Sequence, residues 1–224
     1  MKIRNFFWEM TIRKFFWALY GIFFILLIAL GLLATLLNLN QEDVKQSEEK
    51  RHESYRLSNE FRQSVDDLTR FARIYVVTGD PRYEQQYQDV LAIREGRKAR
   101  PDGQSASLMD LMKKSGFTTE EINEINEAKS RTDHLLKIEE NAFLAMKGQY
   151  EDGTGKSKTG KPNQAWAMRL LHDDVYNLEK VNATMPINDF IFNHDFRTKS
   201  ALEKIAKRGK LYLNISIGLL AVLS

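Results

Sequence analysis

The pattern of hydrophobic and polar residues divides the chain into two apolar ends and a long amphipathic middle. Residues 15–37 form an apolar run without a single charged side chain. As a helix this run would extend roughly 35 Å, against a hydrocarbon core of about 30 Å. We therefore predict a transmembrane helix over 15–37, in preference to a cleaved signal peptide, whose apolar stretch is shorter.

The C-terminal end, residues 211–224, is also mainly apolar but shorter than a membrane span. It predicts the start of a second transmembrane helix that is cut short, and a buried C-terminal core helix is the alternative. Lys204, Lys207, Arg208 and Lys210 would then lie on the outer side of the membrane, which the positive-inside rule disfavours. Their long side chains could still reach the headgroups.

The segment between the two apolar ends has a helical period almost throughout. Apolar residues recur at spacings of four and three, which places them on one stripe of an α-helix. The β-branched run over residues 74–77 continues this stripe, so it predicts the end of a helix and not a strand. The stripe consists of Phe61, Val65, Leu68, Ala72 and Tyr75.

A Gly-Asp-Pro corner follows this helix. Gly79 can adopt the left-handed conformation that ends a helix, and Asp80 can cap the next one. Pro81 fits a first helical turn because its missing N–H has no helical partner there. We expect a second helix to start at this corner.

Helix signals recur further along the chain. Gly116 is predicted to close a short helix, and Thr118 with Glu121 forms a capping box at the start of a long one. Phe117 precedes the box and could pack on Ile122 as a hydrophobic staple. The long helix is expected to continue until Gly148.

The C-terminal half of the middle segment is a polar loop followed by a helical pattern. Residues 148–162 are rich in glycine and predict the loop, whereas residues 164–210 return to helical periodicity. Pro186 removes one backbone hydrogen bond, so we expect a kink or a break there. Asp173 or Asp174 is expected to cap a helix.

The predicted architecture is all-α. It is an antiparallel helical bundle of the four-helix type over residues 38–210, between the transmembrane helix at 15–37 and the partial one at 211–224. Its first and last helices are long and close to the membrane. Residues 1–14 form an N-terminal tail.

The charge distribution orients the chain. The formal net charge of +3 arises in the tail, where Lys2, Arg4, Arg13 and Lys14 face only Glu9. Basic residues before the span and acidic residues after it place the N-terminus in the cytoplasm and residue 38 onward outside. The balanced charge of residues 38–210 gives no electrostatic reason to expect nucleic acid as a partner.

Residue chemistry argues against an enzyme within the chain. Cysteine is absent, which excludes thiol nucleophiles, zinc–cysteine sites and disulfides. The GTGKS motif at 153–157 lacks the glycine that a phosphate loop needs at position 150, where Tyr150 stands, and no strand precedes it. We predict no catalytic residue and no cofactor.

Two acidic–histidine clusters do not have metal-ligand spacing. His172, Asp173 and Asp174 are adjacent, as are His194 and Asp195. Adjacent residues on a helix point in different directions, whereas two ligands on one face need a spacing of about four. We predict no metal site.

Two arginines on the first long helix are the candidates for ligand binding. Arg70 and Arg73 lie three residues apart, and guanidinium groups commonly hold carboxylates or other small anions. The alternative is a solvated helix face, or pairing with Asp66 and Asp67. Three tyrosines could line a pocket beside them or simply pack in the core: Tyr75, Tyr83 and Tyr87.

Three long segments resemble the extracytoplasmic part of bacterial membrane sensors. They cover residues 66–101, 108–148 and 185–200, and LTRFARIYVVTGDPRYEQQY is the most specific stretch. The best match is to methyl-accepting chemotaxis proteins. Sensor histidine kinases and diguanylate cyclases have similar input domains.

This resemblance implies a helical ligand-binding domain on the periplasmic face of a bacterial inner membrane, working as a homodimer. The ligand would be a small molecule or a periplasmic binding protein. Binding would shift the second membrane helix and so signal to cytoplasmic machinery, which in such receptors follows beyond residue 224. A membrane-anchored helical adaptor without signalling output is the alternative.

Overall fold

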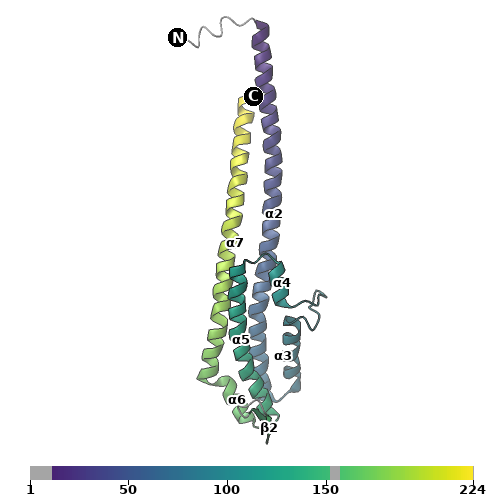
Figure 1. The fold of residues 1–224 in the computed structure, drawn as a ribbon, viewed down its shortest axis with the longest axis vertical. Helices are drawn as coiled ribbons and strands as arrows, with labels where there is room; N and C mark the ends of the chain where they lie inside the picture. Colours follow the sequence, from purple (N-terminus) through teal and green to yellow (C-terminus); the bar gives the residue numbers. More distant parts are fainter. Residues whose placement is uncertain (1–11, 152–156, 224) are drawn as a thin grey trace. The chain divides into compact units, whose positions relative to one another are not determined.

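The computed structural model describes residues 12–151 and 157–223, and these residues form a helical protein (Figure 1). The all-α prediction is thereby confirmed. The helices are α2 (Ile12–Thr78), α3 (Pro81–Arg94), α4 (Leu108–Lys114), α5 (Thr119–Met146), α6 (Gln164–His172) and α7 (Asp174–Leu223). The strands are β1 (Gln149–Glu151) and β2 (Ser157–Thr159).

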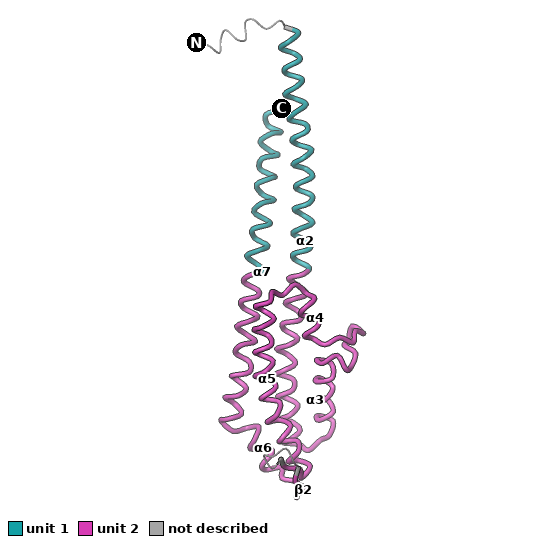
Figure 2. The backbone as a smooth tube through the Cα atoms, in the orientation of Figure 1, with its two compact units in different colours: residues 1–49, 198–224 teal, residues 50–197 magenta. Residues whose placement is uncertain are grey.

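The chain divides into two compact units (Figure 2). One unit comprises residues 1–49 and 198–224, and the other comprises residues 50–197. The second unit, called the helical domain below, contains α3 to α6 and the parts of α2 and α7 that pack with them.

The N-terminal part of α2 has the properties of a membrane span. Most of its apolar side chains between Phe15 and Leu36 are exposed, and exposed apolar surface of this extent favours contact with lipid. Among the described residues, α2 is the one helix that is long and apolar enough to cross a membrane. Residues 211–223 are helical as well, but the second membrane span stays a prediction.

A polar contact joins α2 and α7 within the first unit. The amide of Asn40, which is buried, donates to the carbonyl of Ile205 at 3.0 Å. Gly209 lies against the same side chain, and a Cβ at this position would be 2.2 Å from Asn40 Oδ1. The small residue therefore permits the close approach of the two helices.

The core of the helical domain is built on the predicted stripe of α2. All five residues of the stripe are buried, which confirms the helical interpretation of residues 61–75. They belong to one hydrophobic cluster with side chains from the other helices. The main contributions come from Tyr87, Met112, Ile125, Leu135, Phe143, Leu171, Tyr176, Ile187 and Phe190.

The predicted helix boundaries are found where α2 ends and α5 begins. Gly79 has a φ of +70°, and the Asp80 carboxylate accepts from the backbone N–H of Arg82 at 2.9 Å at the start of α3. Thr118 and Glu121 form the expected capping box. Local sequence signals therefore fix both starts.

Phe117 also takes part in a contact between helices that the sequence did not indicate. Its ring lies 5.6 Å from that of Phe190 and 4.5 Å from the imidazole of His194, measured between centroids. The residue before the capping box thus helps to hold α7 against the start of α5, in addition to any staple on α5 itself.

The C-terminal half of the domain differs from expectation in two places. Residues 149–151 pair antiparallel with 157–159, so the predicted polar loop contains a short hairpin; most of GTGKS lies outside the described residues. Helix α7 continues through Pro186, so of the kink or break predicted there the break is wrong, and the kink stays a prediction. Ala183 and Ile187 are buried on either side of the proline and hold both halves in one helix.

Asp173 is the cap that the sequence suggested as one of two options. Helix α6 ends at His172, and the Asp173 side chain accepts from the backbone N–H of Tyr176 at 2.8 Å. It therefore separates α6 from α7 and starts the helix that carries Tyr176 into the core.

Candidate functional site

The two predicted arginines have protein partners. Arg70 is exposed, pairs with Asp67 at 2.7 Å and lies over the ring of Phe71. Arg73 donates to the carbonyl of Leu171 at 2.9 Å and to Asn177 at 2.6 Å. Arg70 thus forms the surface pair that was its alternative, and Arg73 ties α2 to the corner between α6 and α7.

The predicted tyrosines lie in the core or at its edge. The ring of Tyr75 contacts that of Phe143 edge-on, with centroids 4.9 Å apart, and burial raises its pKa to about 12. Tyr83 is half-buried and packs against Phe71. Tyr87 is buried, with its ring against Phe143. None of the five predicted residues lines either of the two cavities described below.

A buried carboxylate lies next to Tyr87. Glu139 is fully buried and accepts from the hydroxyls of Tyr87 at 2.9 Å and Tyr176 at 2.6 Å. Burial raises the pKa of Glu139, and the two tyrosine hydroxyls act against this rise. Burial and the nearby Glu139 raise the pKa of both tyrosines as well. This tyrosine–glutamate centre joins α3, α5 and α7.

A second buried polar centre joins α2, α5 and α7. The two carboxylate oxygens of Glu121 accept hydrogen bonds from Arg197 at 2.7 and 2.9 Å. Oε1 of Glu121 also lies 3.0 Å from Nδ1 of His194. Nε2 of His194 lies 2.7 Å from the hydroxyl of Ser54. Because an ionised Glu121 only accepts, Nδ1 of His194 carries the proton. We call this the histidine–glutamate centre.

The order serine, histidine and carboxylate in this centre is that of a catalytic triad, but the surroundings are not. Ser54 and His194 are almost fully buried, and the hydroxyl oxygen of Ser54 also lies 3.0 Å from the carbonyl oxygen of Arg51. A nucleophile must reach substrate, and this one is enclosed by helices. The arrangement therefore serves helix packing.

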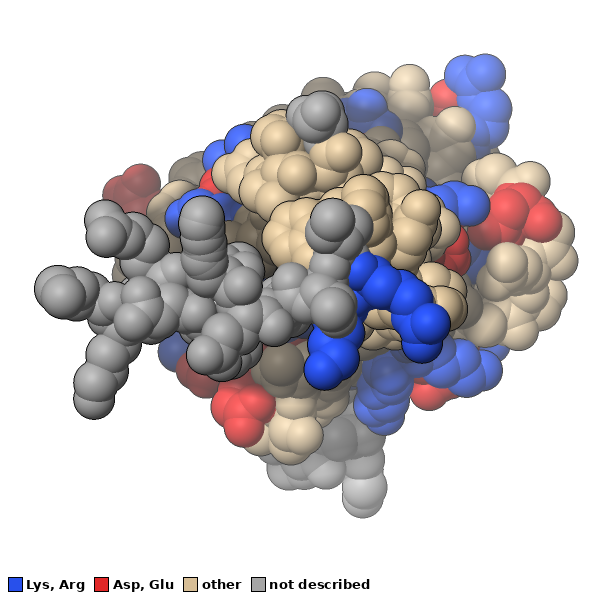
Figure 3. All heavy atoms as spheres, turned by 90° about the horizontal axis from the view of Figure 1, so that it is seen from above, with Lys and Arg blue, Asp and Glu red and all other residues tan. Residues whose placement is uncertain are grey.

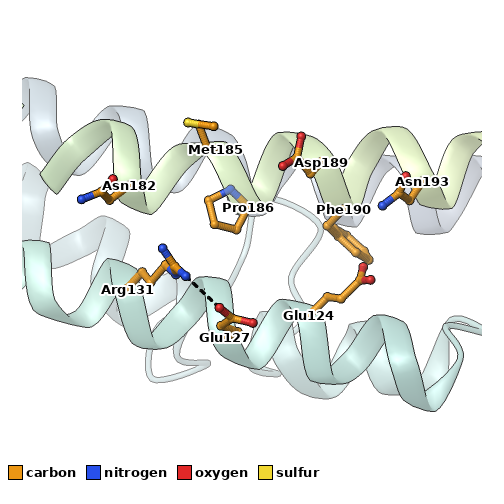
Figure 4. Close-up of a pocket in the computed structure, with 9 residues that line it drawn as sticks. All are labelled: Glu124, Glu127, Arg131, Asn182, Met185, Pro186, Asp189, Phe190 and Asn193. Carbon is orange, nitrogen blue, oxygen red and sulfur yellow. Dashed lines mark hydrogen bonds and ion pairs between the residues drawn. The ribbon is translucent and has the colours of Figure 1, made fainter. Parts of the chain in front are cut away.

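A groove between α5 and α7 has a volume of about 340 Å³ (Figure 4). Arg131 and Glu127 of α5 pair with each other at 2.9 Å on the side that faces Pro186. Glu124 and Asp189 add acidic groups, but all four charged side chains are exposed to solvent. Within the described ranges no group of side chains has the arrangement of a metal site.

The cavity with buried charge lies between α2, α3 and the segment that leads to α4. It has a volume of about 330 Å³, and residues 56–67 of α2 form one wall. Arg94, at the end of α3, and Arg100, in the loop that follows, line it from the other side. We call this cavity the arginine pocket.

Arg100 is held in place by a compact turn. Its backbone N–H donates to Gln104 at 2.9 Å, and its carbonyl accepts from Gly103 at 2.9 Å. The loop returns close to the end of α3, where Gly96 has a φ of +76° and a Cβ would lie 2.5 Å from the backbone nitrogen of Ser107. Gly96 therefore permits the path that brings Arg100 to the pocket.

The two pocket arginines are deeply buried. Only 8% of Arg94 and 4% of Arg100 is accessible to solvent. Arg100 pairs with Glu60 through Nη2, and its Nε is 3.9 Å from Asp102, too far for a hydrogen bond. The nearest acid to Arg94 is Asp133, at 4.0 Å. Burial lowers the pKa of Arg94, which the surrounding acids oppose.

Three nitrogens of these guanidinium groups lack a hydrogen-bond acceptor among the described residues. They are Nη1 of Arg94 and both Nε and Nη1 of Arg100. Buried donors are nearly always paired in native proteins, so unpaired nitrogens on two side chains that line a cavity call for an external acceptor. The chemistry of the arginine pocket is that of an anion-binding site.

Sequence reasoning did not select either of these arginines. One available signal was that Arg94 lies seven residues after Tyr87, on the same face of α3. Arg100 lies in a loop without periodicity, and its burial depends on the turn and on the approach at Gly96. No local pattern predicts that contact.

The comparisons with known proteins add no name to this site. Protein-family models, curated proteins and solved structures all gave no match to the chain.

On the face shown in Figure 3, basic and acidic side chains are interspersed, which agrees with the balanced charge of the sequence. The functional argument therefore rests on the arginine pocket and on the apolar part of α2.

Proposed function

We propose that the chain is the input module of a bacterial transmembrane sensor of the chemoreceptor type. The helical domain binds a small solute, or a periplasmic binding protein that carries one, outside the inner membrane. Cytoplasmic machinery attached beyond the second membrane helix converts binding into a signal. A histidine kinase or a diguanylate cyclase would use the same input in the same way.

One observation carries this proposal. Helix α2 contains both an apolar stretch that is long enough to cross a membrane and one wall of the arginine pocket, without a break between Ile12 and Thr78. A binding site on such a helix gives a ligand a direct effect on an element that enters the membrane. An adaptor without output gives no reason for buried arginines whose nitrogens lack an acceptor.

The orientation is tested by labelling with a membrane-impermeant maleimide in intact cells. The chain has no cysteine, so single substitutions report without background. Lys137→Cys on α5 is exposed, and we expect it to be labelled from outside. Lys14→Cys, before the apolar stretch, should react only after permeabilisation. The reverse pattern would overturn the proposal.

The proposed homodimer uses an apolar stripe on α7. Leu178, Met185 and Phe192 are spaced by seven residues and are 56–71% exposed, as expected for a helix seam that meets a partner. If two copies meet along α7, a Met185→Cys variant should form a disulfide-linked dimer under mild oxidation. The exposed Lys137→Cys should not, and equal crosslinking of both would exclude this interface.

Signal transfer is tested in a hybrid receptor. Residues 1–224 are joined to the cytoplasmic part of a methyl-accepting chemotaxis protein, and kinase activity is measured in membranes. A solute that binds the purified chain should change kinase activity. Binding without any change in kinase activity would show that the chain binds the solute without signalling, and it would overturn the sensor proposal.

A further inference from the structure

We propose that the arginine pocket is a binding site for a small organic carboxylate with a short apolar chain, held by Arg94 and Arg100. This inference rests on the proposed function only in taking the bound acid as the sensed solute. The site itself is argued from the pocket.

Three buried guanidinium nitrogens supply the hydrogen-bond donors of the proposed site. Nη1 of Arg94 and both Nε and Nη1 of Arg100 are buried without an acceptor among the described residues. Leaving a charged donor unpaired in this environment costs more than leaving a neutral one. A carboxylate offers two oxygens with about four acceptor positions, enough for the three unpaired nitrogens.

A carboxylate of the protein already binds at one edge of the site. Glu60 of α2 pairs with Nη2 of Arg100, and it also lies 3.6 Å from Arg56. The Glu60 side chain is 30% accessible, whereas that of Arg100 is only 2% accessible. Glu60 therefore enters from the rim, and it does not reach the remaining nitrogens of Arg100.

The charge of the pocket favours a single negative charge on the ligand. Arg56, Arg94 and Arg100 line it together with Glu60, Asp67 and Asp102. Two of these acids already have basic partners, since Glu60 pairs with Arg100 and Asp67 pairs with Arg70. A doubly charged phosphate would be repelled by three nearby carboxylates, whereas a monocarboxylate adds one charge next to two incompletely paired arginines.

The rest of the wall is apolar, and the space is small. Val90, Ile93 and Leu108 face the cavity from α3 and α4, with Pro101 beside them. At about 330 Å³ the pocket lies at the lower end of ligand sites, with room for about ten groups of water size. A short aliphatic acid places its carboxylate on the arginines and its chain on this wall.

The experiment is isothermal titration calorimetry of the full chain in detergent micelles. The probes are butyrate, hexanoate and inorganic phosphate, and equal amounts of sodium chloride serve as the ionic control. We expect at least one of the two carboxylates to bind with a saturable isotherm, and phosphate to bind at least about tenfold more weakly. Saturable phosphate binding with no carboxylate binding would overturn the carboxylate assignment.

Three variants test the residues. Arg100→Met should weaken carboxylate binding by at least about tenfold, since it removes a charged bidentate group. The matched control is Arg97→Met, in the same loop with the same change of charge, because Arg97 is exposed and pairs with Glu95 at 2.5 Å. It should bind like the wild type. Glu60→Gln should bind more tightly, because it removes the competing charge.

Equal losses in Arg100→Met and Arg97→Met would show a general charge effect and overturn the site. So would full binding by Arg100→Met with a cooperative unfolding transition like that of the wild type. Failure of the site is distinguishable from failure of the sensor proposal. The titrations use purified chain and do not depend on orientation, whereas maleimide labelling in cells does not depend on any ligand.

Discussion

The tyrosine–glutamate centre and the arginine pocket are both built from buried ionisable groups, but they differ in how those groups are paired. Glu139 is fully buried and accepts two tyrosine hydroxyls. Arg94 and Arg100 are nearly as buried and leave three nitrogens without an acceptor among the described residues. One centre is closed on itself, and the other faces a cavity.

This difference separates structural from functional burial. Removing a buried polar group whose hydrogen bonds are made within the protein is costly, because its partners are left buried and unpaired. Removing a buried cation with unpaired donors costs the protein little stability. The same donors form hydrogen bonds when a ligand enters. Stability measurements and binding measurements should therefore rank the two centres in opposite order.

The largest expected effect is on the tyrosine–glutamate centre. Glu139→Ala leaves the hydroxyls of Tyr87 and Tyr176 buried without an acceptor and opens a small cavity, so it should lower the free energy of unfolding by about 3 kcal/mol. Urea unfolding followed by circular dichroism measures this loss. A variant as stable as the wild type would show that the centre is not closed.

Tyr87→Phe is the matched control for that prediction. It removes one hydrogen bond to Glu139 and keeps the ring that packs on Phe143. Its cost should be about 1.5 kcal/mol, the upper end of the usual range for one intramolecular hydrogen bond. A larger loss than in Glu139→Ala would mean that the tyrosine ring, and not the carboxylate, organises the centre.

The arginine pocket should respond much less. Arg100→Met replaces a buried cation by an apolar chain of similar length, which removes two unpaired buried nitrogens and loses one pair with a half-exposed Glu60. The Glu60 carboxylate left behind is 30% accessible to solvent and still lies 3.6 Å from Arg56, so the substitution does not leave a buried unpaired charge. We expect the free energy of unfolding to stay within about 1 kcal/mol of the wild type.

Arg73→Met provides the contrast on stability. Its guanidinium donates through Nε to the carbonyl of Leu171 and through Nη2 to Asn177, so the same substitution should cost about 2 kcal/mol. If Arg100→Met destabilises as much as Arg73→Met, Arg100 is a structural residue. If Arg73→Met is neutral, Arg73 returns as a ligand candidate.

Most of the fold could be predicted because it depends on local signals. The stripe from Phe61 to Tyr75, the corner at Gly79 and the capping box of Thr118 and Glu121 are each read within a few residues, and each is present. The helix break at Pro186 was wrong because burial of its neighbours outweighs one lost hydrogen bond. Tertiary packing therefore determines that the helix continues through the proline.

The candidate site could not be predicted in the same way. Arg70 and Arg73 have the spacing of a helix face, but spacing does not reveal that Asp67 and Leu171 occupy them. Arg100 has no spacing signal, and it is buried because a loop returns past Gly96. Which charged side chain remains unpaired is a property of the packed structure.

The smallest expected effect concerns pH and the histidine–glutamate centre. Burial lowers the pKa of His194 below its ordinary value of 6.5, while Glu121 and Asp195 oppose this and Arg197 supports it. The unfolded chain therefore binds more protons than the folded one just below pH 6.5, so stability rises with pH through this window and is complete above it. Burial raises the pKa of Glu121, but Arg197, the Thr118 backbone and His194 bring it below 4.5, so a separate loss follows in acid.

Urea unfolding of the full chain at pH 5–8 isolates the histidine component. His194→Gln cannot titrate, so its stability should change less between pH 5 and pH 7 than that of the wild type, although it is lower at neutral pH because Ser54 and Glu121 lose their partner. His134→Gln is the matched control, since His134 is exposed and pairs only with Glu179 among the contacts described, at 3.2 Å. Its pH profile should parallel that of the wild type. Parallel profiles for His194→Gln as well would mean that His194 keeps one protonation state on folding, and the histidine–glutamate centre would then contribute no pH dependence of its own through this histidine.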